Sequence, residues 1–204
     1  ASADYYLGKS IVLNASFRTD GSSKFGSNKQ FNPTWSAGAA WHIGEEAWMK
    51  KALPALSHAT LRAAYGFTGD VNTSTSHLLV IQYLQQQYRY FGDETFNLGT
   101  IPSAPNPDLG WEKTQDAKAG LDFGLWKDRL TLNTEYYYRL STDVVTSSPV
   151  QSTTGFTHVY FNAADIMNSG IELTLNGKII QTKDWGLSAA VNFAYNYNKV
   201  LKYN

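Results

Sequence analysis

The sequence predicts an all-β fold, an antiparallel up-and-down sheet of the kind that forms a transmembrane β-barrel segment, with about seven strands visible. Three observations predict it. Apolar and polar residues alternate along most of the chain. Short connections alternate with long ones. The alternating segments are also longer than the strands of most soluble sheets.

The alternation locates the strands along the chain. We expect them at residues 11–18, 35–43, 60–68, 111–125, 130–144, 166–178 and 185–199. Across the middle of each strand, one set of alternate positions is apolar or small and uncharged, whereas the other set is polar and rich in Gly, Ser and Asn. Because successive side chains point to opposite faces, the sheet has one apolar face and one polar face.

The connections between these strands differ in length. Residues 127–129 and 181–184 form tight turns, and long polar loops are expected at 19–34, 69–110 and 146–165. The connection at 44–59 favours a short helix that includes Ala47, Trp48 and Leu53, because Pro54 cannot continue it. Short turns at one end and long loops at the other are typical of outer-membrane β-barrels.

Composition excludes several classes of function. The 204 residues fit one large β domain, and 17 acidic residues balance 17 basic ones, so no nucleic-acid partner is expected. The absence of cysteine excludes disulfides and thiolate metal sites, and no apolar run is long enough for a transmembrane helix. The four histidines lack metal-ligand spacing, and no catalytic motif occurs. We therefore expect no enzyme, no catalytic residue, no metal and no cofactor.

Strand length and aromatic placement favour lipid on the apolar side. From Trp185 to Tyr197 the chain advances twelve residues, or roughly 40 Å of strand. Tilted by about 40°, this segment rises by roughly 30 Å, which matches the hydrocarbon thickness of a bilayer. Aromatic residues near the strand ends predict lipid-facing girdles at both interfaces; they are Trp35, Tyr136, Tyr138, Trp185, Tyr195 and Tyr197.

Two other architectures also obey the alternation. A soluble β-sandwich would bury the apolar face against a second sheet and could bind glycans through its Tyr- and Trp-rich loops. A small closed barrel with a structural or adhesive role would pair its first strand with its last. Both alternatives stay open on the sequence.

Several motifs occur in an order and at spacings that resemble SusC/RagA-type TonB-dependent outer-membrane transporters. The resemblance covers nearly the whole chain, and the order of the motifs is more specific than any one of them. The motifs are LNASFRTDGSSKFG (13–26), NPTWSAGAAWHIGEEAWMK (32–50), LRAAYGFTGD (61–70), NPDLGWEKTQDAKAGLDFG (106–124), RLTLNTEYYYRLSTDVV (129–145), TTGF (153–156), NSGIELTL (168–175) and NFAYNYNKV (192–200).

The resemblance implies a barrel of about 22 strands with a plugged lumen, of which residues 1–204 would be a C-terminal part. The plug domain and the N-terminal extension are absent from these residues. Members of the family lie in the outer membrane of Gram-negative bacteria, in contact with its lipid, and import glycan oligosaccharides or peptides. A SusD-like surface lipoprotein acts as a lid, and the TonB complex supplies energy through the missing N-terminal part.

Two sets of residues are candidates for functional roles. Charged side chains of the polar face are expected to line the lumen, to pair with one another or with a plug, and to tune selectivity collectively; they are Arg18, Arg62, Asp116, Lys118, Asp122, Glu135, Arg139 and Glu172. The aromatic loop residues Tyr83, Tyr88, Tyr90 and Phe91, with Arg89, are candidates for contact with ligand, because aromatic faces stack on sugar rings or peptide side chains. The alternative is an extracellular loop that packs on itself.

Overall fold

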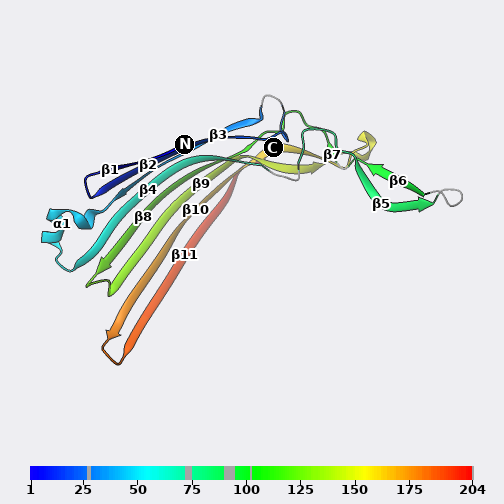
Figure 1. Cartoon of the computed structure of the whole chain (residues 1–204). Helices are drawn as coiled ribbons and strands as arrows, with labels where there is room; N and C mark the ends of the chain where they lie inside the picture. Colours follow the sequence, from blue (N-terminus) through cyan, green and yellow to red (C-terminus); the bar gives the residue numbers. More distant parts are fainter. Residues whose placement is uncertain (27–28, 72–74, 90–94, 102, 204) are drawn as a thin grey trace.

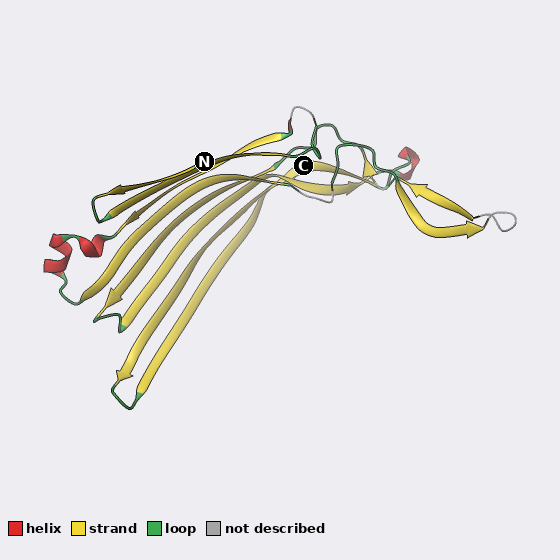
Figure 2. Cartoon of the chain, in the orientation of Figure 1, coloured by secondary structure: helices red, strands yellow, loops and turns green. Residues whose placement is uncertain are grey.

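The computed structural model describes residues 1–26, 29–71, 75–89, 95–101 and 103–203, with 84–89, 95–98 and 152 described by their backbone alone. Most of the described chain is strand, and nearly all of its strands form one long curved sheet (Figure 1, Figure 2). No described helix is both long and apolar enough to cross a bilayer.

The sheet is antiparallel along its main path, as the alternation predicts, so the predicted fold class is confirmed. Its neighbouring strands are, in spatial order, β1 (Ser2–Leu7), β2 (Ile11–Gly21), β3 (Phe31–Trp41), β4 (Leu56–Asp70), β8 (Glu112–Leu125), β9 (Leu130–Pro149), β10 (His158–Gln181) and β11 (Gly186–Tyr203). The two-residue strand β7 (Ser103–Ala104) pairs in parallel with the start of β10. A separate hairpin of β5 (Gln82–Arg89) and β6 (Thr95–Thr100) extends beyond one end of the sheet (Figure 1).

Strand register keeps the apolar side chains together on one face. Phe123 pairs with Leu132, Leu132 pairs with Leu175, and Leu175 pairs with Val191, so four adjacent strands present one apolar row. A slip of one residue would move a strand's entire apolar set to the other face. The register is therefore specified by the same alternation that predicts the strands.

All short connections lie at one end of the sheet, which we call the short-turn end; the opposite end is the loop end. At the short-turn end, β3 and β4 are joined through a 3₁₀ turn, η2 (Ile43–Glu45), and a helix, α1 (Ala47–Ala52). This confirms the predicted helix for Ala47 and Trp48, whereas Leu53 lies just after its end. The turn between β8 and β9 holds Trp126, Lys127 and Asp128 at positive φ. Hydrogen bonds from the Trp126 N–H to the Ala55 carbonyl (2.8 Å) and from the Asp128 N–H to Ser57 Oγ (2.9 Å) fix this turn against the start of β4.

The loop end contains more strand than the sequence predicts. The predicted loop 146–165 is wrong, because β9 continues to Pro149 and β10 begins at His158. Its Ser- and Thr-rich composition resembles a loop, but the two segments pair with each other. The predicted loop 69–110 contains β5, β6 and β7, and β2 and β3 both extend into the predicted loop 19–34. Strand β1 also precedes the first predicted strand.

No part of the described chain covers the apolar face. Val191 is 58% exposed, Ile171 is 40% exposed, and Leu132 is half-buried. The sandwich alternative is wrong, because the described residues form one large sheet and a small hairpin instead of two packed sheets. The alternative of a small closed barrel is also wrong, because β1 and β11 are the two edges of the sheet and do not pair with each other.

Candidate functional surfaces

Ion pairs connect β4, β8 and β9 across the polar face. The Arg62 guanidinium donates two hydrogen bonds to the Asp122 carboxylate, from Nε (2.7 Å) and Nη2 (3.2 Å). Its Nη1 lies 3.7 Å from Glu135, whose other carboxylate oxygen lies 3.6 Å from Lys118 Nζ. Two acids and two bases thus neutralise one another in a single cluster.

A glycine allows this cluster to form. Gly120 lies between Arg62 and Glu135 in the strand register. A Cβ atom at Gly120 would lie 3.1 Å from Arg62 Nη2 and 3.4 Å from its Cζ, so the guanidinium occupies space that a side chain on β8 would need. The absence of that side chain lets the Arg62 guanidinium pass over β8 towards Glu135 on the far side.

A second pair lies closer to the loop end. Arg139 Nη2 donates to Asp116 Oδ2 at 2.6 Å, while the other oxygen, Oδ1, is buried and has no hydrogen-bond partner among the described residues. The pair borders a cavity of about 650 Å³, which Lys118 and Ser141 also line. A smaller cavity of about 210 Å³ lies beside the first cluster, where Arg62, Lys118 and Glu135 line it.

The remaining two predicted lumen residues stay outside these clusters. Arg18 pairs locally with Asp20 at 2.8 Å. Glu172 is exposed and faces Glu135 in the register, and the structure gives it no ion pair with a described residue. Two carboxylates in directly opposed positions repel each other, so Arg62 and Lys118 also relieve repulsion between β9 and β10.

The predicted girdle residues of β9 and β11 form two neighbouring rows. Tyr136 and Tyr195 flank Ile171 in one row, and Tyr138 and Tyr197 flank Ser169 in the next. Tyr65 extends the second row through Ala117, and its ring centroid lies 5.6 Å from that of Trp35. Trp185 lies at the opposite end of the sheet, immediately before β11, and is exposed.

Sequence reasoning missed other tryptophans at the short-turn end. Trp41, Trp48 and Trp126 are also exposed there, beside the connections that join the strands. The signal that could have found them is a tryptophan at or within a connection of this end, where a ring can lie at a membrane interface.

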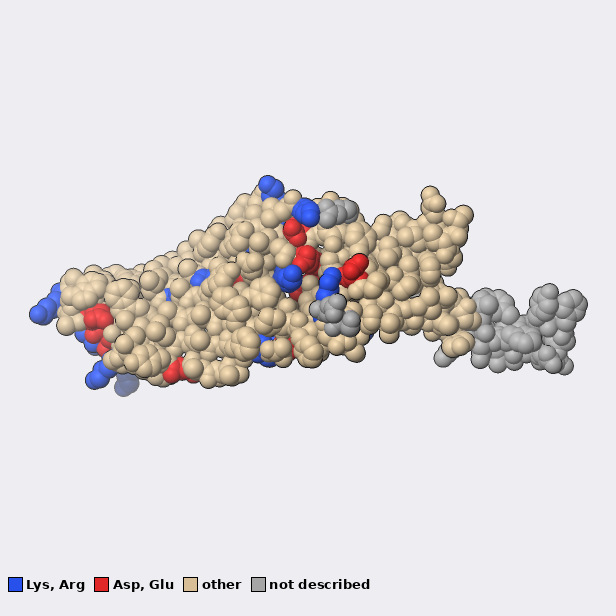
Figure 3. Space-filling model, turned by 90° about the horizontal axis from the view of Figure 1, so that it is seen from above, with Lys and Arg blue, Asp and Glu red and all other residues tan. Residues whose placement is uncertain are grey.

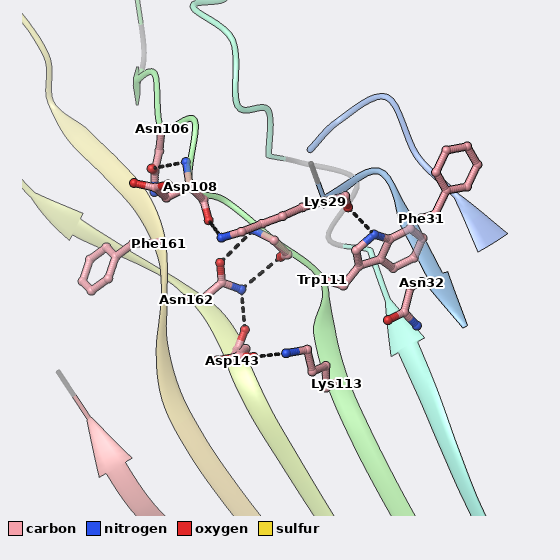
Figure 4. A pocket seen from close by; sticks show the side chains of 11 residues that line it. Lys29, Phe31, Asn32, Asn106, Asp108, Trp111, Lys113, Asp143, Phe161 and Asn162 are labelled. Carbon is pink, nitrogen blue, oxygen red and sulfur yellow. Dashed lines mark hydrogen bonds and ion pairs between the residues drawn. The ribbon is translucent and has the colours of Figure 1, made fainter. Parts of the chain in front are cut away.

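The NPDLGW segment anchors the loop end. Leu109 and Trp111 are buried with Phe25, whose ring centroid lies 5.0 Å from that of Trp111. The Asn162 side chain bonds both the N–H and the carbonyl of Gly110 (2.9 and 3.0 Å), as Figure 4 shows. These contacts indicate a structural role for the segment where the chain enters β8.

A cavity of about 490 Å³ lies beside this anchor (Figure 4). Its two ammonium groups are both engaged, Lys29 with the Asp108 carbonyl (2.5 Å) and Lys113 with Asp143 (2.9 Å). Phe31 and Phe161 add aromatic surface to the lining. The cavity therefore offers amide and aromatic contacts, and of its two ammonium groups Lys113 has a carboxylate partner whereas Lys29 donates to a neutral carbonyl.

The predicted ligand-contact residues belong to the β5–β6 hairpin region. Tyr83 is exposed on β5. Tyr88 and Arg89 lie in β5, with only their backbone described, and Tyr90 and Phe91 lie outside the described residues. Their contact with ligand stays a prediction. In the part of the chain that the structure describes, no group of three or more His, Cys, Asp or Glu could hold a metal ion.

Viewed from above, charged side chains are visible at the end that holds α1 and in a second group about midway along the molecule (Figure 3). Much of the surface between these two groups is uncharged. A sheet with an exposed apolar face, a charged polar face, and short and long connections at opposite ends is the wall of an outer-membrane-type β-barrel.

Comparison with protein families identifies which kind of barrel this is. The family model described as TonB dependent receptor-like, beta-barrel, matches residues 1–204. The chain belongs to the TonB-dependent receptor β-barrel family.

Individual relatives agree with this assignment. The chain is 32% identical over 204 residues to the TonB-dependent receptor SusC of Bacteroides thetaiotaomicron, covering 98% of this chain and 20% of SusC. It is 30% identical to the TonB-dependent receptor P39 of Formosa agariphila, covering 94% of this chain and 18% of that receptor. The chain thus spans about one-fifth of the length of these relatives.

Solved structures contain a segment with the same fold as this chain. A chain of the RagAB peptide importer in its closed-closed state matches with a TM-score of 0.83 and 30% identity, covering 98% of this chain and 22% of that chain. The siderophore receptor PirA from Pseudomonas aeruginosa matches with a TM-score of 0.67 and 16% identity, covering 98% of this chain and 34% of that chain. At that identity, the likeness to PirA concerns the fold alone.

Proposed function

We propose that residues 1–204 form a C-terminal part of the barrel of an outer-membrane, TonB-dependent nutrient importer, with a barrel of about 22 strands. The apolar face contacts lipid and the polar face lines the lumen. The observation that carries this proposal is the opposite chemistry of the two faces. No described part of the chain covers Val191 and its neighbours in the apolar row, while the charged clusters lie on the other side.

The cargo we propose is an oligosaccharide or a peptide, held between extracellular loops and a SusD-like lid lipoprotein. Release follows when the TonB complex pulls on a plug domain. The support for this class of cargo is the similarity to SusC and to a chain of the RagAB peptide importer. In this mechanism the described residues supply the wall, the paired charges of the lumen and the anchored loop end.

Adjacent residues on opposite faces test the orientation of the wall. The chain has no cysteine, so Val191→Cys and Asn192→Cys each introduce a single thiol into this segment. In a receptor that carries this chain, inserted in native membranes, Asn192→Cys should react with a charged water-soluble maleimide at least about tenfold faster than Val191→Cys. The reason is that a thiol in hydrocarbon meets neither the reagent nor the water needed to ionise it. Equal rates in folded receptor would overturn the proposal, and equal rates in denatured receptor are the control.

The cargo requires a separate measurement. Uptake of labelled oligosaccharides and of labelled peptides should be compared in cells with and without the receptor that carries this chain. Loss of one class of uptake identifies the cargo, whereas unchanged uptake of both classes contradicts the nutrient proposal. Co-purification of a surface lipoprotein with the receptor tests the lid.

A further inference from the structure

A tyrosine of β9 lies on the polar face between two tyrosines of the apolar face. Tyr136 and Tyr138 belong to the apolar rows, and successive side chains of a strand point to opposite faces, so Tyr137 points to the polar side. Its register partners are Lys118 on β8 and Gly170 on β10, which both belong to the polar set. The wall therefore presents the ring of Tyr137 to the proposed lumen, at the level of the two girdle residues beside it.

A glycine lets this ring lean over the neighbouring strand. A Cβ atom at Gly170 would lie 2.6 Å from Tyr137 Oη and 2.7 Å from its Cζ, so the phenol occupies the space above β10 that a side chain would need. Because the ring inclines towards the sheet, one of its faces is turned to the backbone and the other to the lumen. Tyr137 is half-buried, which agrees with this placement. Such a ring is a platform on which an apolar surface of a ligand can stack.

Amide side chains surround the platform. Asn196 is the register partner of Gly170. Asn168 and Asn198 are opposite each other one row nearer the loop end. Opposed residues have Cβ atoms about 5 Å apart and diagonal neighbours about 7–8 Å apart, so these amides lie within reach of a ligand stacked on Tyr137. Asn198 Nδ2 donates to Asn168 Oδ1 at 2.5 Å, which leaves Asn168 Nδ2 and Asn198 Oδ1 without a hydrogen-bond partner among the described residues.

The adjacent charges narrow the class of ligand. Lys118 lies 3.6 Å from Glu135, and the Arg139 guanidinium is held by a carboxylate of β8. Glu172, one row nearer the short-turn end than Gly170, is exposed and has no ion pair with a described residue. An unpaired carboxylate is a strong acceptor for hydroxyl groups, whereas an anionic group of a peptide would find neither of these two cations free. The surroundings therefore favour a neutral ligand with many hydroxyl groups.

We propose, resting on the proposed function, that Tyr137 is a stacking platform for a pyranose ring of an oligosaccharide cargo. A pyranose combines an apolar face of C–H groups with a rim of hydroxyl groups, and the wall offers the complementary pair of an aromatic face and a polar rim. The C–H face lies on the phenol ring, while the hydroxyl groups bond Asn168, Asn196 and Glu172. This inference assigns the cargo to the glycans rather than to the peptides.

Fluorine NMR tests the contact directly. Tyr137 is labelled as 3-fluorotyrosine in a receptor that carries this chain, and a mixture of linear hexasaccharides of glucose, mannose, galactose and xylose is added. The resonance should move as the sugar concentration rises, and a mixture of neutral hexapeptides should leave it in place. The same label at Tyr136, on the apolar face, is the matched control and should respond to neither mixture. Any other response of Tyr137, including movement with the hexapeptides or with neither probe, would overturn the inference.

Removing the ring tests the stacking. For the hexasaccharide that binds most tightly, Tyr137→Ala should weaken binding by roughly tenfold, because the aromatic contact is lost. Tyr137→Phe keeps the ring and should bind within about threefold of the unsubstituted receptor. Tyr136→Ala should leave binding unchanged, since its ring is on the apolar face. Titration calorimetry measures all three variants, and equal losses for Tyr137→Ala and Tyr136→Ala would contradict a platform on the polar face.

Removing an amide tests the polar rim. Asn196→Ala should weaken binding of the same hexasaccharide by roughly fivefold, the effect expected of one hydrogen bond. Asn192→Ala is the matched control, because Asn192 lies on the same strand and face but two rows nearer the short-turn end. Binding that is reduced equally by both substitutions, or by neither, would overturn the placement of the sugar beside β11.

Failure of the inference is distinguishable from failure of the proposed function. Equal labelling of Val191→Cys and Asn192→Cys contradicts the orientation of the wall, and with it the proposed function. A correctly oriented receptor that imports peptides, and whose Tyr137 resonance ignores the hexasaccharides, contradicts only the sugar platform.

Discussion

The loop end and the middle of the wall place their apolar side chains in different surroundings. At the loop end, Phe25, Leu109 and Trp111 are buried in a small protein core. In the wall, Ile171 and Val191 are covered by no part of the described chain. The first region resembles an ordinary soluble core, whereas the second requires an apolar solvent supplied from outside the protein.

The backbone polar groups of the two regions also find their hydrogen-bond partners in different ways. The loop end satisfies its irregular backbone with side chains, as when Trp111 Nε1 donates to the Lys29 carbonyl at 2.7 Å. The wall satisfies its backbone through paired strands, which is what a segment in hydrocarbon needs. The comparison teaches that the loop end should keep its structure without a bilayer, whereas the stability of the wall should depend on one.

The largest expected effect comes from breaking the small core. Trp111→Ala removes a buried ring and leaves the Lys29 carbonyl without its donor, which should lower the free energy of opening the loop end by about 3–5 kcal/mol. Limited proteolysis of a receptor carrying this chain measures it, because cleavage follows the population of the opened form. Trp185→Ala is the control, and cleavage at the loop end should not change with it, since its indole is 78% exposed at the opposite end. Similar cleavage rates for the two variants would contradict a core at the loop end.

The next effect separates the two faces of the wall. Val191→Lys should lower the free energy of unfolding from vesicles by about 2–4 kcal/mol, because it places a charge in hydrocarbon. Asn192→Lys, one residue further on the polar face, should change it by less than about 1 kcal/mol. Urea titration in vesicles measures both values. If the apolar face contacted water, Val191→Lys would be tolerated as well as its neighbour.

Much of the wall could be predicted from the sequence, because successive side chains of a strand point to opposite faces and so alternate in polarity. Leu121, Phe123 and Leu125 predict β8 and its apolar side without any knowledge of its neighbours. The extension of β9 to Pro149 could not be predicted, because its Ser- and Thr-rich end lacks alternation and is held by pairing with β10. Local pattern thus reveals strands but not the pairing that lengthens them.

The candidate surfaces were also predictable only in part. That Arg62 and Asp122 belong to the polar face follows from the sequence, but their contact depends on β4 lying next to β8 across a long connection. Contacts between distant segments are set by register, which a local pattern does not contain.

A smaller effect tests the ion pairs of the polar face. Arg62→Gln and Asp122→Asn in a double-mutant cycle should give a coupling energy of about 0.5–1 kcal/mol, because the two side chains are partly exposed and water screens their charges. Arg18 and Asp20, a more exposed pair, should couple more weakly in the same assay. The coupling between Arg62 and Asp122 should decline as salt increases, and a value independent of salt would exclude an ion pair facing water.

The smallest effect lies outside the wall, in the connection between β3 and β4. The hydrogen bond and charge of Lys50 lower the pKa of Glu45 below its ordinary value of 4.5. Because the folded-state pKa is lowered, any stabilisation is fully present above pH 4.5 and is lost as the pH falls through the lowered value.

Lys50→Gln should raise the Glu45 pKa towards 4.5, as measured by carbon-13 titration of the labelled carboxyl group. Lys51→Gln is the matched control, because the structure gives Lys51 no ion pair with a described residue. An equal shift in both variants would show that general surface charge, rather than the Lys50 hydrogen bond, sets this pKa. Both variants should leave the wall unchanged, since the pair is exposed and stands apart from the strands that meet lipid.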